Sequence, residues 1–132
     1  MKVLRYFFLL VDIGFIVYWL ITALHLIPEK YLYNDYTNVI LVNWNWSFLP
    51  LDLLISFTGL YSVYLNSKSL NKWKIYAFIS LILTSVSGLQ AISYWALSGE
   101  FDPAWWIPNL FLLLYPWIFI PNLLSDLEQK NN

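Results

Sequence analysis

The chain contains a long apolar stretch with no charged side chain, Ile75–Leu97, which reads IYAFISLILTSVSGLQAISYWAL. An α-helix rises 1.5 Å per residue, so about 20 mostly apolar residues cross the ~30 Å hydrocarbon core of a bilayer. Three further stretches qualify, at about Tyr6–Ile27, Phe48–Leu65 and Ala104–Leu124. Because the connections are short, consecutive helices should be antiparallel neighbours. The sequence predicts an all-α integral membrane protein, an antiparallel four-transmembrane-helix bundle forming a single domain over residues 1–132.

The composition points to the same class. Hydrophobic residues make up 60% of the chain and charged residues 11%, against roughly 45–50% and about 25% in soluble domains. The absence of Cys excludes a disulfide framework and a thiolate metal site. Seven Lys and Arg against eight Asp and Glu leave no basic surplus for nucleic acid. The expected partner is the lipid bilayer.

The distribution of basic residues predicts the orientation. Six of the seven fall on one side of the predicted bundle: Lys2, Arg5, Lys68, Lys72, Lys74 and Lys130. The other side carries Lys30 together with Glu29, Asp35, Glu100 and Asp102. Lys and Arg accumulate on the cytoplasmic side of membrane proteins, so both termini should be cytoplasmic. The first apolar stretch exceeds the 7–15 residues of a signal-peptide core, and we expect it to be retained as a helix.

Residues 40–49 allow two interpretations. Ile40, Val42, Trp44, Trp46 and Phe48 alternate with other residues at a period of two, which suits an extended strip along the membrane interface. In the alternative, the second helix begins near residue 40 and is kinked at Pro50.

Two acids lie inside the predicted spans, Asp12 and Asp52, and no Lys or Arg lies there with them. Such residues are costly in a membrane and should face the bundle interior. Each is therefore protonated, hydrogen-bonded in a wet cavity, or available to a cationic ligand. Counting residues from the cytoplasmic helix ends separates the two by roughly 10 Å in depth. We therefore expect two separate sites.

Other polar residues are assigned to these sites by depth. Asp12 should be near Ser80 and Thr84, a possible proton site. Asp52 should be near Thr22, Gln90 and Asn109. A layer nearer the outside contains His25, Asn45, Tyr94, Trp105 and Trp106. Together these predict a ligand pocket that opens outward or sideways and is bounded by Trp19, Trp95 and Trp105.

Small and polar residues also recur at helical spacing in two spans. One set is Asn45, Asp52, Ser56, Gly59 and Val63, and the other is Ser80, Thr84, Ser87 and Ala91, with Gly88 beside it. We interpret these stripes mainly as helix-packing surfaces, because small residues allow membrane helices to approach closely. Pro116 should kink the fourth span and free the Leu112 carbonyl for a neighbour.

No catalytic or cofactor-binding motif is recognisable. One His and no Cys cannot supply the three or four ligands of a zinc site. His25 is most simply an interfacial residue, with a proton acceptor at the pocket mouth as the functional alternative. We expect a non-enzymatic protein without a metal or cofactor.

Three runs resemble the YvaD-type family of small Bacillus membrane proteins: Ile40–Ser56 (ILVNWNWSFLPLDLLIS), Ser87–Ser93 (SGLQAIS) and Trp105–Phe111 (WWIPNLF). The resemblance covers nearly the whole chain. It implies a four-span, multi-pass protein of the bacterial plasma (inner) membrane, without an assigned activity. Its motif residues here are Asn45, Trp46, Asp52, Gln90, Trp106 and Asn109.

A weaker resemblance is to EXPERA-type four-helix membrane proteins, which include sterol isomerases and sterol-binding proteins. It rests on Trp44–Leu49 and the proline-rich fourth span. The His and Glu set of the isomerases is not reproduced, because the single His is His25 and no Glu lies within a span. Isomerase chemistry is therefore not expected.

Three functions remain open. The leading hypothesis is binding of a small apolar or cationic ligand, lipid-derived ones included, in an outward-facing intramembrane pocket. In it Asp52 pairs with the ligand, polar side chains orient it and tryptophans supply cation–π contacts. The alternatives are a proton-coupled small-molecule exporter that works as a homodimer through Asp12, and a structural or regulatory partner of another membrane protein.

Overall fold

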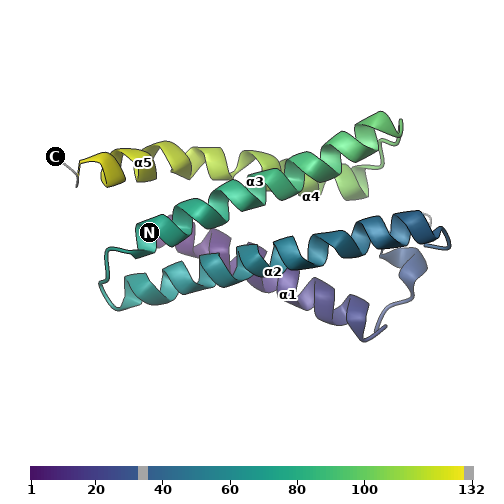
Figure 1. Ribbon diagram of the computed structural model, residues 1–132, viewed down its shortest axis with the longest axis horizontal. Coiled ribbons are helices and arrows are strands. Elements are labelled where there is room, and N and C mark those ends of the chain that lie inside the picture. The colour runs from purple at the N-terminus through teal and green to yellow at the C-terminus, as the bar shows by residue number, and fades with distance from the viewer. Residues whose placement is uncertain (33–35, 130–132) are drawn as a thin grey trace.

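The computed structural model describes residues 1–32 and 36–129, and every regular element in these ranges is helical (Figure 1). The elements are α1 (Lys2–Ala23), the short 3-10 helix η1 (Glu29–Tyr31), α2 (Val39–Ser67), α3 (Trp73–Leu97), α4 (Pro103–Leu114) and α5 (Pro116–Glu128). The start of α1 and the end of α5 lie at the same end of the bundle, here called the terminal end (Figure 1). The opposite end, where α1 leads to α2 and α3 to α4, is the loop end. Asp35 and Lys130, which entered the charge argument, lie outside the described residues.

Four segments are long and apolar enough to cross a membrane: α1, α2, α3 and the α4–α5 pair. The predicted all-α, four-helix architecture is confirmed. The largest difference from the expected helix bounds is the start of α2, at Val39 instead of Phe48; α1 runs from Lys2 to Ala23 instead of Tyr6–Ile27, and α5 continues to Glu128.

Residues 40–49 form the first turns of α2, so the helical interpretation of this segment is the right one. Asn38 caps the helix, since its side-chain oxygen accepts a hydrogen bond from the Ile40 N–H at 3.0 Å. Trp44 and Phe48, four residues apart, meet edge to face with ring centroids at 5.0 Å. The interpretation as an extended interfacial strip is wrong. The side chains alternate in type at a period of two, but the backbone of this segment is helical and its start is capped.

A residue with left-handed backbone ends α1 earlier than expected. His25 has φ +52°, and the Leu26 N–H donates back to the Ile21 carbonyl at 3.1 Å, which is the pattern of a Schellman motif. Gly99 (φ +70°) ends α3 in the same way, with the Glu100 N–H donating to the Trp95 carbonyl at 3.0 Å. His25 is therefore a helix-terminating residue.

The fourth span is broken between α4 and α5, as predicted for Pro116. The carbonyl that a neighbouring helix satisfies is that of Leu113, which accepts a hydrogen bond from Ser85 Oγ of α3 at 2.9 Å. Trp117 Nε1 in turn donates to Ser85 Oγ at 3.0 Å. The expected carbonyl, that of Leu112, was thus one residue off. The hydrogen bonds of Ser85 hold α3 against the break between α4 and α5.

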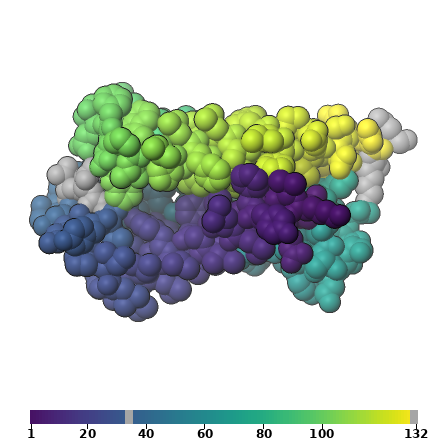
Figure 2. Space-filling model, turned by 180° about the vertical axis from the view of Figure 1, so that it is seen from behind, coloured from purple at the N-terminus to yellow at the C-terminus, as the bar shows by residue number. Residues whose placement is uncertain are grey.

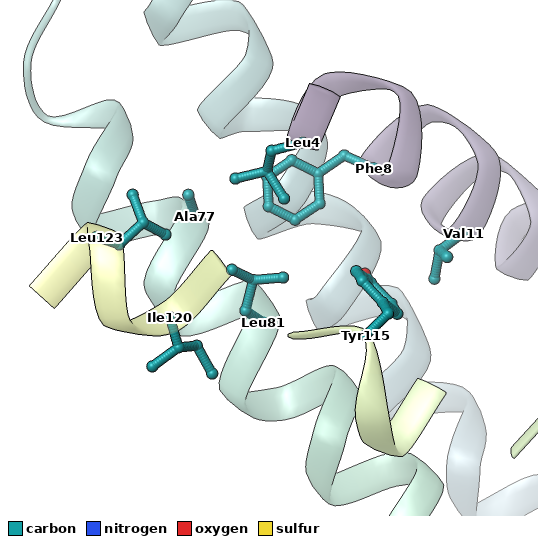
Figure 3. Close-up of a cluster of buried hydrophobic side chains, with 8 residues drawn as sticks. All are labelled: Leu4, Phe8, Val11, Ala77, Leu81, Tyr115, Ile120 and Leu123. Atoms are coloured by element: carbon teal, nitrogen blue, oxygen red, sulfur yellow. The ribbon is translucent and has the colours of Figure 1, made fainter. Parts of the chain in front are cut away.

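The hydrophobic core lies toward the terminal end, where side chains of α1 meet those of α3 and α5 (Figure 3). It contains Leu4, Phe8, Val11, Ala77, Leu81, Tyr115, Ile120 and Leu123. Phe7 adds ring contacts to Tyr115 at 5.0 Å and to Phe119 at 5.2 Å. Apolar packing therefore joins the first and last helices at this end. Toward the loop end α4 packs on α3 and not closely on α1, which leaves room for a pocket.

Candidate functional site

A pocket of about 430 Å³ lies between α1 and α4, and α2 and α3 form its back wall. Figure 2 shows a hollow between these two helices on the side of the bundle. The lining is mostly apolar and aromatic. Its polar side chains are Tyr18, Asn45, Asp52, Ser87 and Asn109. The volume is in the range of sites that hold drug-sized ligands, and a few polar groups in an apolar wall are typical of them.

Asp52 is the acid of the pocket and is 5% exposed. Its carboxylate accepts two hydrogen bonds, from Trp19 Nε1 of α1 at 2.9 Å and from Ser87 Oγ of α3 at 3.2 Å. Both partners are neutral donors, so they orient the carboxylate without cancelling a negative charge. None of the side chains that line the pocket in the described structure is Lys or Arg. A cation that enters would find an uncompensated carboxylate.

Each of the four spans contributes one tryptophan to the lining: Trp19, Trp44, Trp95 and Trp105. Trp44 meets Trp95 edge to face at 5.7 Å and stacks on Tyr94 at 4.1 Å. Trp19 is buried and also contacts Trp46 at 5.4 Å. Indole faces attract organic cations within about 6 Å of the ring centroid. The tryptophan rings and the Asp52 carboxylate therefore both favour a positively charged ligand.

The other polar residues of the lining are Asn45 and Asn109. Asn45 Nδ2 is buried and has no hydrogen-bond partner among the described residues, so it is a donor available to a ligand. Asn109 Nδ2 donates to the carbonyl of Trp105 at 2.8 Å, one turn earlier in α4. Of the predicted ligand-binding set, six residues line the pocket together: Trp19, Asn45, Asp52, Trp95, Trp105 and Asn109.

Three residues of the predicted set lie elsewhere. Thr22 is buried, but its hydroxyl donates to the Tyr18 carbonyl at 2.8 Å within α1. Gln90 is exposed on the outer face of α3. His25 is exposed beyond the end of α1 and pairs with Glu29 at 3.3 Å. Depth alone suggested these residues, whereas the rotation of α1 and α3 about their axes turns Thr22 and Gln90 away from the pocket, and α1 ends before His25.

Asp12 occupies a separate position, fully buried where α1 packs on α2 and α3. Its carboxylate oxygens have no hydrogen-bond partner within the part of the chain that the structure describes. The hydroxyls expected as its donors are directed at backbone carbonyls instead: Ser80 Oγ donates to Ile55 O at 3.1 Å and Thr84 Oγ1 to Ser80 O at 2.7 Å. The Thr84 bond is to the preceding turn of its own helix, as is common for Thr in helices, whereas the Ser80 bond joins α3 to α2.

Because Gly59 of α2 has no side chain, the Asp12 side chain has room against α2. A Cβ at Gly59 would lie 2.8 Å from Asp12 Cγ and 2.9 Å from Ser80 Oγ, closer than van der Waals contact. Asp52 is seven residues from Gly59 along α2, or about 10 Å of helix. The two acids thus have different neighbours, in line with the prediction of two separate sites.

Two residues of the site were not predicted: Ser87 was expected in a packing stripe, and Trp44 lay in residues 40–49, which allowed either an interfacial strip or the start of the second helix. Ser87 donates to Asp52, and Trp44 lines the pocket. Helical spacing could have indicated both residues, because side chains four apart share one face of a helix. Ser87 shares a face with Ala91, and Trp44 with Phe48, and all four residues line the pocket. No group of three or more His, Asp and Glu residues within 1–32 and 36–129 is placed to hold a metal ion.

Four apolar helical segments, each long enough to cross a membrane, pack around a side pocket, and this arrangement suggests the class of multi-pass helical membrane proteins. A family model described as a family of unknown function (DUF5360) matches residues 4–130, and the chain belongs to this family. It is similar to the uncharacterized protein YvaD of Bacillus subtilis (strain 168), with 50% identity over 126 residues, 96% of this chain and 95% of the relative. The resemblance to the YvaD-type family is thereby confirmed. No solved structure matches the chain.

Proposed function

We propose that the protein binds a small apolar or cationic ligand in the pocket between α1 and α4, without catalysing a reaction, and that Asp52 anchors the ligand. The observation that carries this proposal is the oriented Asp52 carboxylate at the back of an otherwise apolar and aromatic pocket. Burying an acid among apolar side chains costs free energy unless it is compensated. A cationic group on the ligand supplies that compensation and explains why the site holds an acid at all.

The preferred ligand is an organic cation with aromatic or aliphatic bulk. An ammonium group at Asp52 would form a charge-assisted hydrogen bond, worth roughly 1.5–3 kcal/mol. Trp19 and Ser87 already hold the two carboxylate oxygens, so little further ordering of the acid is needed on binding. The free Nδ2 of Asn45 offers a second polar contact for a ligand that carries an acceptor.

The alternative of proton-coupled export through Asp12 has less support from the geometry. Asp12 is enclosed between helices and does not line the pocket. Competition between a proton and a transported molecule for one carboxylate requires that both can reach it. The pocket acid is Asp52, and we therefore place ligand recognition there.

The test compares an amine with its neutral isostere on the full chain in lipid nanodiscs. Radiolabelled dimethyl(biphenylmethyl)amine is the cationic probe, and isobutylbiphenyl, in which carbon replaces nitrogen, is the neutral one. We expect the amine to bind the unaltered protein at least ~10-fold more tightly, since each 1.4 kcal/mol is a factor of ten. Asp52→Asn should remove this preference, because the amide retains an acceptor for Trp19 but carries no charge.

Glu128→Gln is the matched control, because it makes the same change of charge on an exposed side chain of α5. It should leave both affinities unchanged. Equal amine binding by the unaltered protein and Asp52→Asn would refute the role of Asp52. If neither probe bound the unaltered protein, the proposed function itself would fall.

A further inference from the structure

The pocket opens on the side of the bundle. At the terminal side of the opening, Phe7 of α1 stacks with Phe111 of α4 at 6.0 Å and with Tyr115 at 5.0 Å, which closes it there. Beyond this contact α1 and α4 diverge, and the hollow between them is seen from the side in Figure 2. Leu10 and Phe111, which line the pocket, are 68% and 39% exposed. These residues form the rim of the opening.

Gly14 widens this opening. It lies in α1 among the lining residues, and a Cβ placed on it would meet no atom within 4 Å. Gly is unfavourable in a helix interior by roughly 0.8–1.0 kcal/mol relative to Ala, so no benefit to the helix accounts for it. The contrast with Gly59 and Gly88, where a Cβ would collide with a neighbouring helix, shows that close packing is not its role either.

In a membrane, the side of a bundle faces hydrocarbon chains. Every described residue that lines the pocket belongs to one of the four spans, and none belongs to the segments that join them. Asp52 is near the middle of the 29-residue helix α2, far from either end. A molecule dissolved in the bilayer can therefore reach Asp52 through the opening between Leu10 and Phe111.

We infer that the ligand comes from the bilayer and is a single-chain amphiphile with a basic amine. Its amine meets Asp52 between Trp19 and Ser87, and its chain leaves through the opening past Leu10 and Gly14. This inference rests on the proposed function and names the ligand class. The pocket volume suits one chain and not the whole of a two-chain phospholipid, and the exposed apolar rim gives the chain a surface continuous with the surrounding lipid.

The test uses dodecyldimethylamine with a photoreactive diazirine at the far end of its chain, added to the full chain in nanodiscs. Irradiation followed by peptide mass spectrometry locates the adducts. We expect them at the rim, around Leu10, Gly14 and Phe111, and an excess of unlabelled dodecyldimethylamine should suppress them. Adducts spread evenly over the lipid-facing residues and insensitive to this competition would overturn the inference.

Gly14→Trp should obstruct the opening, because its side chain would occupy space that is empty in the structure. We expect at least a 5-fold loss of competed adduct, and a smaller loss for Gly14→Leu. Ile13→Trp is the matched control: the neighbouring residue is exposed and does not line the pocket, so its yield should be unchanged. Far-UV circular dichroism and gel filtration confirm that each variant is folded.

The outcomes separate the two proposals. If Asp52→Asn and Gly14→Trp both lower the competed yield, the proposed function and the route from the bilayer are supported. If only Asp52→Asn does so and the adducts lie at the loop end, the pocket binds ligand but is loaded from there, and this inference is overturned. If neither substitution has an effect, both proposals fall.

Discussion

Gly88 sets the distance between α3 and α4, and replacing it by Ala tests that packing directly. A Cβ at this position would lie 2.6 Å from the Asn109 carbonyl oxygen, 2.6 Å from the Leu113 backbone nitrogen and 3.1 Å from the Leu112 carbonyl carbon. These are backbone atoms, so no side-chain rotation relieves the contact. To restore a separation of about 3.5 Å, α4 must retreat by about 0.9 Å.

The expected cost follows from two opposing effects. Overpacking a well-packed contact destabilises by typically 1–3 kcal/mol, whereas Gly to Ala in a helix interior gains about 0.8–1.0 kcal/mol of propensity. Gly88→Ala should therefore lose up to about 2 kcal/mol of unfolding free energy. Gly14→Ala, with open space around its Cβ, should gain about 1 kcal/mol from the propensity effect alone. The difference in unfolding free energy between the two variants gives the cost of the close contact at Gly88.

The assay is equilibrium unfolding in mixed detergent micelles, followed by far-UV circular dichroism. Asn109 and Leu112 also line the pocket, so a shift of α4 in Gly88→Ala should weaken amine binding as well. If Gly88→Ala were stabilised as much as Gly14→Ala, α3 and α4 would not be in the contact described, and the reasoning would be refuted.

Two further predictions follow from the buried acid Asp12 and from the charge distribution. Gly59→Ala should lower the unfolding free energy by about 1–3 kcal/mol, less the gain in helix propensity, because its Cβ collides with Asp12. Adding Asp12→Ala to this variant should restore most of the lost unfolding free energy. A double-mutant cycle that shows no coupling between the two substitutions would contradict the contact. The excess of Lys and Arg near the terminal end predicts that both termini are cytoplasmic, so a fluorescent protein fused after Asn132 should fluoresce and a periplasm-dependent phosphatase fused there should be inactive. The reverse pattern would show that the bundle has the opposite orientation.

Part of the site could be predicted because the depth of a residue in a membrane-spanning helix follows from its position along the sequence. Counting residues from the helix ends brought Asp52 and Asn109 to one level and put Asn45 and Trp105 in the next layer outward, and the structure places all four around one pocket. The same counting could not give the rotation of each helix. It therefore selected Gln90 at the level of Asp52, whereas the α3 side chain that donates to Asp52 is that of Ser87, three residues earlier.

The number of apolar helices of membrane-spanning length, their alternating direction and the family could be predicted from the sequence. The reason is that a helix in lipid must be apolar and must satisfy its own backbone hydrogen bonds, so each span is specified by local composition. The structure was needed to show that residues 40–49 form the first turns of α2, that Asp12 sits against Gly59 away from the pocket, and that α1 and α4 diverge toward the loop end. The last two features depend on how helices that are distant in the chain pack together, and small residues such as Gly59 let two helices approach closely.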